Sequence, residues 1–322
     1  MKYTVLGRTG VQVSRLCFGT MSFGGDADAA ASAAMYKACR DAGVNFYDTA
    51  DQYSKGRSEE ILGGLMKGHR DELVIATKCF NPTGGDVNAR GTSRRHVTRA
   101  LEASLKRLQT DRVDILFLHH FDALTPLEES VRALEDAVRS GKALYPAVSN
   151  WSAWQTQKAV SLQEANGWAR LQLIQPMYNL VKRQAEVELL PMAQANGIGV
   201  IPYSPGAAGL LSGKYSGEAS GRLKTNKMYQ ARYGEPWAFE TAQKFAAFCK
   251  QRGLHPVSVA IAWVGAHPAV TAPIIGARNV EQLQASLDAV SIDMTPELRA
   301  EIAALSRTPP PATDRLEEQK SQ

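Results

Sequence analysis

A regular alternation of short apolar runs with amphipathic stretches constrains the fold of this chain more than any other feature of its sequence. Each run has six to eight residues, as expected of strands that are buried on both faces of a parallel sheet. Amphipathic stretches separate consecutive runs, which predicts helices between them. The eight runs cover residues 16–21, 45–50, 73–78, 113–119, 144–150, 171–178, 199–204 and 271–276.

Two of the intervening segments show the helical pattern clearly. In residues 93–109, apolar side chains recur every three or four positions. Another helix is expected to open at residues 125–128, where Thr125 and Glu128 match a capping box and Pro126 stands at the first helical position. The apolar stripes are Val97, Leu101, Leu105 and Leu108 in the first helix, and Leu127, Val131, Leu134 and Val138 in the second.

Eight strand–helix units in a chain of 322 residues predict a (β/α)8 barrel. A doubly wound open sheet is the competing architecture, but no G-x-G-x-x-G motif follows any predicted strand, which argues against a Rossmann nucleotide domain. The alternation in residues 1–14 predicts an N-terminal β-hairpin. We expect residues 1–307 to form a single domain and residues 308–322, with three prolines followed by charges, to form a loose tail.

The composition excludes several classes of protein. The net charge of +5 is mild and the basic residues are spread along the chain, so no nucleic-acid partner is indicated, although an anionic ligand would account for the bias. No run approaches the roughly 18 apolar residues of a membrane span, and no signal segment is evident. The widely spaced cysteines indicate reduced thiols in the cytosol and no metal site, so a cytoplasmic protein is expected. These are Cys17, Cys39, Cys79 and Cys249.

Ionisable residues stand where three successive predicted strands end. Asp48 ends the second strand and Tyr53 lies in the loop after it, while Lys78 ends the third strand and His119 ends the fourth. Because the carboxyl ends of barrel strands meet at one face, these four side chains are expected to converge on one mouth.

The four side chains together indicate a general acid. A phenol has a pKa near 10 and is a poor proton donor until a neighbouring cation stabilises the phenolate. Lys78 would supply that cation, Asp48 would hold it, and His119 would orient a carbonyl oxygen. A lysine at a strand end can also form a Schiff base, so an aldolase is an alternative.

Neighbouring residues have simpler interpretations. His120 is expected to point away from His119, since strand side chains alternate, although it is also a candidate for the lip of the pocket. Cys79 is expected to be a buried structural thiol, and His96 a surface residue.

At this point the residues match a family pattern. The chain resembles the aldo-keto reductases over nearly its whole length, from FGTMSFGG to the helix after GARNVEQL. The resemblance implies an NADPH-dependent barrel enzyme that reduces an aldehyde, ketone or keto-sugar, with Asp48, Tyr53, Lys78 and His119 as the catalytic tetrad. The motifs that carry it, in order, are DTADQY, ATK, DILFLHH, VSNW, IQPMYN, PYSP…GLLSGK and PIIGARNVEQL.

The resemblance also assigns residues to the cofactor. Gly19, Thr20, Met21 and Asp48 are implied as contacts near its reactive end. Ser149, Asn150 and Gln175 match the residues that hold the nicotinamide carboxamide, and Tyr203 matches the residue that stacks on its ring. Ser204, Gly206, Leu210, Ser212 and Lys214 fall in the pyrophosphate segment. Gly276, Arg278, Asn279, Gln282 and Ser286 fall in the segment for the adenosine end.

Elementary chemistry supports some of these assignments. Asn and Gln side chains both donate and accept hydrogen bonds, as a carboxamide partner must. Arg278 precedes the last predicted barrel helix, where a guanidinium and a helix N-terminus both favour a phosphate. Many family members have a Glu-Asn pair for the adenine where this chain has Ala285 and Ser286, and only Ser286 can hydrogen-bond there.

The loop at residues 221–234 adds basic side chains that could close over the cofactor, although solvated charge explains such a run equally well. They are Arg222, Lys224, Lys227 and Arg232.

The sequence leaves the substrate and the role partly open. Besides a carbonyl reductase, it allows an alcohol or sugar dehydrogenase working in the opposite direction, or a cofactor-binding sensor or regulatory subunit. Oligomeric state is open, with a monomer as the default. Apolar and polar pocket walls are expected from Met21, Phe23, Phe80, Phe121 and Trp151, and from Asn81 and Asp122.

Overall fold

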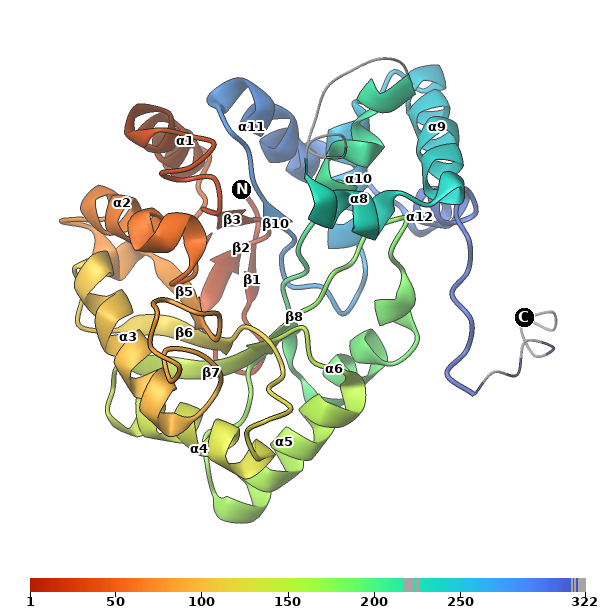
Figure 1. Ribbon diagram of the computed structural model, residues 1–322. Coiled ribbons are helices and arrows are strands. Elements are labelled where there is room, and N and C mark those ends of the chain that lie inside the picture. Colours follow the sequence, from red (N-terminus) through yellow and green to blue (C-terminus); the bar gives the residue numbers. More distant parts are fainter. Residues whose placement is uncertain (217–222, 224–225, 314, 316, 318–322) are drawn as a thin grey trace.

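The computed structural model describes residues 1–216, 223, 226–313, 315 and 317 and has the predicted barrel architecture (Figure 1). Eight strands pair in parallel in the order β10-β3-β4-β5-β6-β7-β8-β9. Backbone hydrogen bonds from Thr271 to Val200 (2.8 Å) and from Ile274 to Pro202 (2.9 Å) join the two ends of this sheet. The result is a closed (β/α)8 barrel.

The barrel strands coincide with the predicted apolar runs, but several are shorter. The runs at 171–178, 199–204 and 271–276 contain Pro176, Pro202 and Pro273, which have no N–H for a strand ladder, so regular pairing stops beside them. The strands are β3 (Cys17–Gly19), β4 (Phe46–Asp48), β5 (Val74–Cys79), β6 (Val113–Leu118), β7 (Ala143–Ser149), β8 (Leu173–Gln175), β9 (Gly199–Val200) and β10 (Ile274–Ile275).

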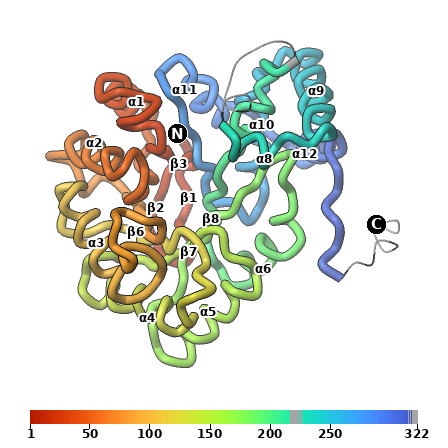
Figure 2. Tube along the Cα trace, in the orientation of Figure 1, coloured from red at the N-terminus to blue at the C-terminus, as the bar shows by residue number. Residues whose placement is uncertain are grey.

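Helices surround the strands, as the tube in Figure 2 also shows. None in the described part of the chain has the length and apolar character that crossing a membrane would require. They are α1 (Ala29–Asp41), α2 (Arg57–Leu65), α3 (Arg94–Leu108), α4 (Leu127–Arg139), α5 (Ala153–Asn166), α6 (Leu189–Asn196), α8 (Lys227–Tyr233), α9 (Pro236–Gln251), α10 (Pro256–Gly265), α11 (Val280–Leu287) and α12 (Pro296–Ala303).

The two predicted apolar stripes are buried in α3 and α4, apart from a half-buried Val138. The predicted capping box is wrong, because α4 begins one residue later with Pro126 as its cap and without a side-chain cap bond. The hydroxyl of Thr125 instead donates to Asp122 Oδ2 at 2.7 Å. A capping box does form at α5, between Ser152 and Gln155.

The predicted N-terminal hairpin is present as β1 (Tyr3–Val5) and β2 (Gln12–Ser14). Leu6 and Val13 from it are fully buried and pack with inward-facing strand residues such as Leu173. The backbone of Gly7 lies against Gln172 and Gly199, just where β8 and β9 begin. The hairpin therefore closes the amino-terminal end of the barrel, opposite the mouth.

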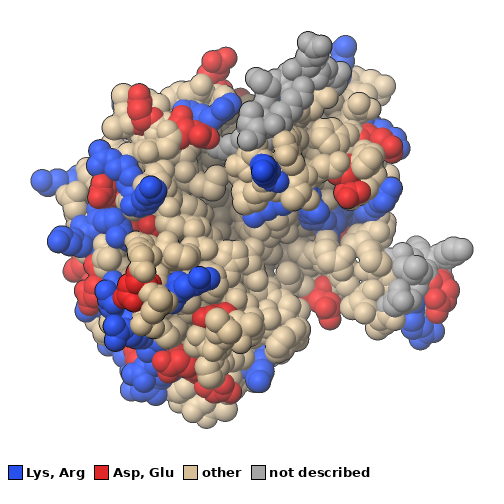
Figure 3. Space-filling model, in the orientation of Figure 1, with Lys and Arg blue, Asp and Glu red and all other residues tan. Residues whose placement is uncertain are grey.

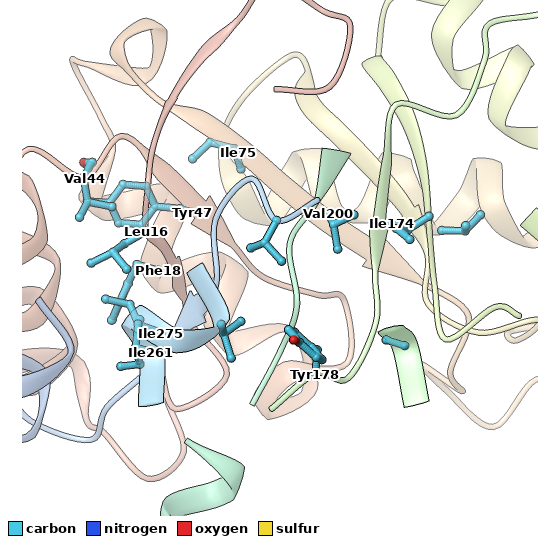
Figure 4. Packing of buried hydrophobic residues seen from close by; sticks show 14 of the residues in the cluster. Leu16, Phe18, Val44, Tyr47, Ile75, Ile174, Tyr178, Val200, Ile261 and Ile275 are labelled. Carbon is cyan, nitrogen blue, oxygen red and sulfur yellow. The ribbon is translucent and has the colours of Figure 1, made fainter. Parts of the chain in front are cut away.

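A second apolar layer lies between the strands and the helices. Alternate strand residues point outward, so Phe18, Tyr47 and Ile75 pack with helix residues such as Ile261 (Figure 4). The segment that follows α12 runs away from the barrel (Figure 1). That the domain ends at residue 307 stays a prediction.

Candidate active site

Alternation along the strands brings the predicted catalytic residues to the mouth. Side chains two positions apart lie on the same face of a strand. A residue two positions after one in the barrel interior therefore also points inward, one layer closer to the carboxyl ends of the strands. By this rule Asp48 follows Phe46, Lys78 follows Ala76, His119 follows Phe117, Ser149 follows Ala147, and Gln175 follows Leu173.

Lys78 is the centre of the site. It is fully buried, and its Nζ lies 2.6 Å from Asp48 Oδ2, 2.7 Å from the carbonyl oxygen of Thr49 and 3.2 Å from Tyr53 Oη. Burial alone would lower the pKa of Lys78, but Asp48 and Tyr53 outweigh burial and raise it. The ammonium is therefore charged and fixed, with one of its donors on the phenol.

The pKa of Tyr53 differs from the sequence-based expectation. Burial raises it above the ordinary value of a phenol, and the nearby charge of Lys78 opposes this shift without cancelling it. Tyr53 therefore holds its proton at neutral pH, while the cation favours the phenolate as it forms.

A tight turn positions the phenol. Ser54 and Lys55 adopt left-handed conformations (φ 49° and 56°), and Gly56 follows at φ 89°. A Cβ on Gly56 would lie 2.7 Å from Arg107 Cδ, so glycine is required there for space as well as for conformation. The Ser54 hydroxyl donates to the carbonyl of Phe23 at 2.8 Å and fastens the turn. Left-handed non-glycine residues are typical of functional sites.

His119 is buried beside Tyr53, with the two rings edge to face at 6.1 Å between centroids. Its Nδ1 has no hydrogen-bond partner among the described residues. Burial, then the charge of Lys78, lowers the pKa of His119 well below its usual value. The ring is thus a neutral imidazole at the mouth, suited to donating one hydrogen bond to an oxygen.

The expectation that His120 points away from His119 is wrong. The two rings stack at 5.1 Å, and His120 also lies 5.2 Å from Phe80. The backbone N–H of His119 still bonds the carbonyl of Cys79 (3.0 Å), but strand β6 has ended at Leu118 and alternation does not extend to His120. The thiol of Cys79, in contrast, is buried and its pKa is raised well above its usual value, as expected of a structural cysteine.

The residues predicted to hold a carboxamide form one network beside the tetrad. Gln175 Nε2 donates to Asp48 Oδ1 at 2.9 Å, and Ser149 Oγ donates to the carbonyl of Gln175 at 2.9 Å. Asn150, in a left-handed conformation, donates to the carbonyl of His119 (3.0 Å) and accepts from Tyr203 Oη (2.8 Å). These polar groups lie together at the carboxyl ends of β7, β8 and β9.

The segment predicted to bind a pyrophosphate has an unusual backbone. Ser204, Ala207 and Ala208 have φ values of 57°, 51° and 56°, and Gly209 follows at 90°. The N–H groups of Ala207 and Gly209 donate within the turn, to the carbonyls of Ser204 (2.9 Å) and Gly206 (3.0 Å), so the turn is closed by its own backbone. The other predicted residues of this segment differ in their surroundings. A side chain at Gly206 would meet no other atom, whereas Leu210 is buried. The hydroxyl of Ser212 donates to the carbonyl of Gly209, and Lys214 Nζ lies beside Gly209.

The adenosine-end residues gather at the start of α11. Arg278 is exposed, its backbone N–H donates to Gln282 Oε1 (3.4 Å), and Asn279 caps the helix. Its guanidinium makes no ion pair with any described residue, which leaves a cation beside a helix N-terminus. Ser286 is buried, and Gly276 lies where β10 passes into this segment.

The first barrel strand contributes the remaining predicted contacts. Gly19 ends β3, and a Cβ on it would lie 2.8 Å from Ile274 Cγ2. Thr20 is buried and its backbone N–H donates to the carbonyl of Asp48 at 2.8 Å, whereas Met21 is 43% exposed. Met21 is therefore free to contact a ligand, and Thr20 ties the first strand end to the second.

Some predicted pocket walls have other roles. Phe23 is fully buried in the core. Asp122 accepts hydrogen bonds from the backbone of Thr92 (2.9 Å) and Leu124 (3.0 Å), so its carboxylate joins two mouth loops. Phe121 packs on Trp151 edge to face, with 5.2 Å between ring centroids, and Asn81 Nδ2 is buried without a partner among the described residues. Arg222 and Lys224 of the predicted closing loop lie outside the described residues.

Sequence reasoning missed Asp51, which is only 2% exposed although it lies in the same loop. Neither carboxyl oxygen has a hydrogen-bond partner among the described residues. Burial and then Glu59 raise the pKa of Asp51 to about 7, opposed by the charges of Arg107 and Lys78. The only hint in the sequence is its position between Asp48 and Tyr53.

Asp51→Asn is expected to make the protein more stable at neutral pH. The unfolded chain releases this proton near pH 4 and the folded chain near 7, so stability falls as the pH rises through that window. Between pH 5 and 7 the loss is at most about 3 kcal/mol, at about 1.4 kcal/mol per pH unit. Denaturant unfolding of wild type, Asp51→Asn and the exposed control Asp293→Asn would measure it. A wild-type–variant difference that does not change with pH would contradict the expectation.

The mouth appears in the space-filling view as a hollow at the centre of the molecule (Figure 3). The Lys78–Asp48 ion pair, the neutral imidazole of His119 and the amide network around Gln175 lie at this mouth. A buried charge pair with convergent hydrogen-bonding groups suits a polar small-molecule ligand.

Comparison with known proteins agrees with this arrangement. The family model described as "Aldo/keto reductase family" matches residues 15–307. The chain is 41% identical to an uncharacterized oxidoreductase, YrpG, of Bacillus subtilis (strain 168), with 92% of this chain and 94% of the relative covered. It is 37% identical to a probable voltage-gated potassium channel subunit beta of Oryza sativa subsp. japonica (98% and 99% covered). It is 32% identical to a versiconal hemiacetal acetate reductase of Aspergillus parasiticus (92% and 94% covered).

The family model spans nearly the whole barrel, and the named relatives are matched over almost their full lengths. The chain therefore belongs to the aldo/keto reductase family.

Proposed function

We propose that this protein is an NADPH-dependent reductase that converts an aldehyde or ketone to an alcohol, with Tyr53 as general acid. Family membership and the oxidoreductase names of relatives support an oxidoreductase in general. The observation that carries the specific proposal is the fully buried Lys78, whose ammonium bridges Asp48 and the Tyr53 hydroxyl.

Residues of this chain bind the carbonyl oxygen and transfer the proton to it. A carbonyl oxygen in the mouth accepts hydrogen bonds from Tyr53 and from the neutral imidazole of His119, and these bonds orient and polarise it. Tyr53 gives up its proton to the developing alkoxide. Lys78, held by Asp48, stabilises the phenolate that remains. In the reverse direction the same phenolate accepts the proton of an alcohol.

The residues of this chain fit a nicotinamide dinucleotide. The bound cofactor would supply the hydride. Asn150 and Gln175 would hold its carboxamide, Tyr203 would flank its ring, the left-handed turn around Ala207 would receive the pyrophosphate, and Arg278 would receive a 2′-phosphate. The second carboxylate oxygen of Asp48 accepts a hydrogen bond from Gln175 Nε2, which ties the amide network to the tetrad.

Arg278→Ala is expected to weaken NADPH binding by about tenfold or more, since a hydrogen bond to a charged group contributes about 1.5–3 kcal/mol. NADH lacks the phosphate and should bind the variant and wild type equally. Higher ionic strength should reduce the wild-type preference. Fluorescence titration of both cofactors tests this, with Lys158→Ala, which removes an exposed charge from α5, as the control. Equal losses for NADH and NADPH would remove Arg278 from phosphate recognition.

The pH profile of reduction follows from Tyr53. Burial raises the pKa of Tyr53 above the ordinary value of a phenol, so Tyr53 keeps its proton through neutral and mildly alkaline pH. Reduction should therefore show no Tyr53-dependent loss in that range, and alcohol oxidation should improve only as the pH becomes strongly alkaline. Rates in both directions, measured across this range, check the assignment. Parallel profiles in the two directions would contradict it.

A carbonyl panel tests the proposed function. Purified protein, NADPH and a set of aromatic aldehydes, ketones and keto-sugars should show loss of the reduced nicotinamide absorbance with formation of the alcohol. Reductive trapping with borohydride tests the aldolase alternative, because a Schiff base on Lys78 would leave a covalent adduct. Adduct formation without cofactor consumption would replace the reductase proposal with an aldolase.

A regulatory subunit is the second candidate. It is favoured by the similarity to proteins named as probable potassium channel beta subunits, which covers nearly the whole chain. The complete tetrad, with its buried ion pair, favours a catalyst instead. Cofactor binding without turnover of any carbonyl would favour the regulatory role.

A further inference from the structure

Arg232 differs from the other partly buried arginines in the described part of the chain. Each of the others pairs with a carboxylate or bonds a backbone carbonyl, as Arg70 does with Asp114 (2.7 Å) and Arg107 with Glu59 (2.7 Å). Arg232 forms no ion pair and no hydrogen bond with any described residue. A guanidinium withdrawn from water without an acceptor is costly, which indicates that an acceptor comes from a ligand.

Aromatic rings hold Arg232 in place. Its Cζ lies 5.9 Å from the ring centroid of Tyr203 and 5.8 Å from that of Tyr229. Helix α8, which carries Arg232, is anchored by the buried Tyr233, whose hydroxyl accepts a hydrogen bond from Asn179 Nδ2 at 3.2 Å. Asn179 also donates to the carbonyl of Ser204 at 2.9 Å. The arginine thus sits on an element that is fastened to the ends of β8 and β9.

Arg232 is directed to the mouth of the barrel. Its partner Tyr203 bonds Asn150, which in turn bonds the backbone of His119. The pKa of His120 is lowered mainly by burial and secondly by the charge of Arg232, so the guanidinium lies near this ring. The ring of His120 in turn stacks on His119. In Figure 3, basic side chains lie along the edge of the central hollow near α8. The guanidinium therefore shares the mouth with the tetrad, and no described acid neutralises it.

We infer that Arg232 forms an anion subsite at the mouth, which selects carbonyl substrates that carry a carboxylate away from the reacting carbon. This inference rests on the proposed reductase function and adds the substrate class. A guanidinium binds a carboxylate with two parallel N–H···O bonds, and contact with aromatic rings does not use its N–H donors. The regions assigned to the cofactor phosphates, around Ala207 and at the start of α11, lie on other segments of the chain.

A matched pair of aldehydes tests the subsite. The probes are 4-carboxybenzaldehyde and its neutral methyl ester, methyl 4-formylbenzoate, which share ring and reacting group. In wild type the carboxylate should have the higher kcat/KM. Arg232→Gln should lower kcat/KM for the carboxylate by about tenfold to a hundredfold, the range for a hydrogen bond to a charged group, and change the ester less than about threefold. Arg232→Lys should lie between.

Two controls separate specificity from general damage. Lys244→Gln removes an exposed charge from the next helix, α9, and should leave both substrates unaffected. Kd for NADPH should be the same in wild type and Arg232→Gln. Equal losses for the two aldehydes, or weaker NADPH binding with unchanged discrimination, would overturn the inference and give Arg232 a structural or cofactor role.

A binding measurement keeps the subsite separate from the proposed function. Calorimetric titration of the protein–NADP⁺ complex with 4-methylbenzoate and with its methyl ester needs no turnover, because neither ligand carries an aldehyde or a carbinol that the cofactor could reduce or oxidise. Preference for the carboxylate that disappears in Arg232→Gln supports the subsite even if no aldehyde is reduced. Turnover of the ester without any preference for the carboxylate would refute the subsite and leave the reductase intact.

Discussion

Tyr53→Phe is expected to lower carbonyl reduction by at least about 10²–10⁴-fold, the usual contribution of a positioned general acid. The variant keeps the ring and loses only the hydroxyl, which lies 3.2 Å from Lys78 Nζ. Stability should change little, because the Lys78–Asp48 pair remains intact at 2.6 Å. Steady-state rates with one aldehyde, at saturating NADPH, measure the loss.

NADPH titration of the same variant is the control, since the phenol is not proposed to contact the phosphates. Kd should stay within about threefold of wild type if the loss is chemical and not a binding defect. Tyr36→Phe, which removes a phenol from α1 hydrogen-bonded to His69, should keep full activity. Wild-type-like rates in Tyr53→Phe would exclude Tyr53 as the acid.

Lys78→Met should lose most of the activity as well. Without the ammonium, burial would raise the pKa of Tyr53 further and the phenolate would have no counter-charge. The variant also leaves Asp48 buried without its cation, which typically costs 3–5 kcal/mol of stability. Activity and unfolding should therefore be measured together.

The double variant Lys78→Met with Asp48→Asn keeps this prediction open to refutation. Replacing both charges removes the unpaired carboxylate, so much of the stability should return. Activity should stay low, because the effect on Tyr53 depends on the cation. Recovery of activity together with stability would mean that Lys78 acts only through folding.

The barrel could be predicted because its signal is repeated along the chain. Eight apolar runs separated by amphipathic helices leave few architectures, and the same two-residue alternation that buries Phe46 and Phe117 carries Asp48 and His119 to the mouth. The residues proposed for catalysis were thus predictable from strand position. The residues proposed to bind the cofactor were predicted from resemblance to a family, since they lie on separate loops far apart in the chain.

Errors arose where tertiary context overrides a local rule. His96 is 2% exposed although it was expected at the surface, because α3 buries a wider face than its leucine stripe. His120 stacks on His119 because the strand has already ended. Within the described part of the chain, the carboxyl of Asp51 and the guanidinium of Arg232 have no hydrogen-bond partner. This depends on which side chains meet in space, and no periodic pattern in the sequence predicts it.

The central claim is hydride transfer from NADPH to a carbonyl carbon at this mouth. The most direct measurement uses NADPH carrying deuterium at the transferable position, wild-type protein and 4-nitrobenzaldehyde, with mass spectrometry of the product. We predict an alcohol that holds a single deuterium on its carbinol carbon, formed by wild type and not by Tyr53→Phe. Absence of alcohol at full cofactor occupancy, or an alcohol without deuterium, would contradict the account.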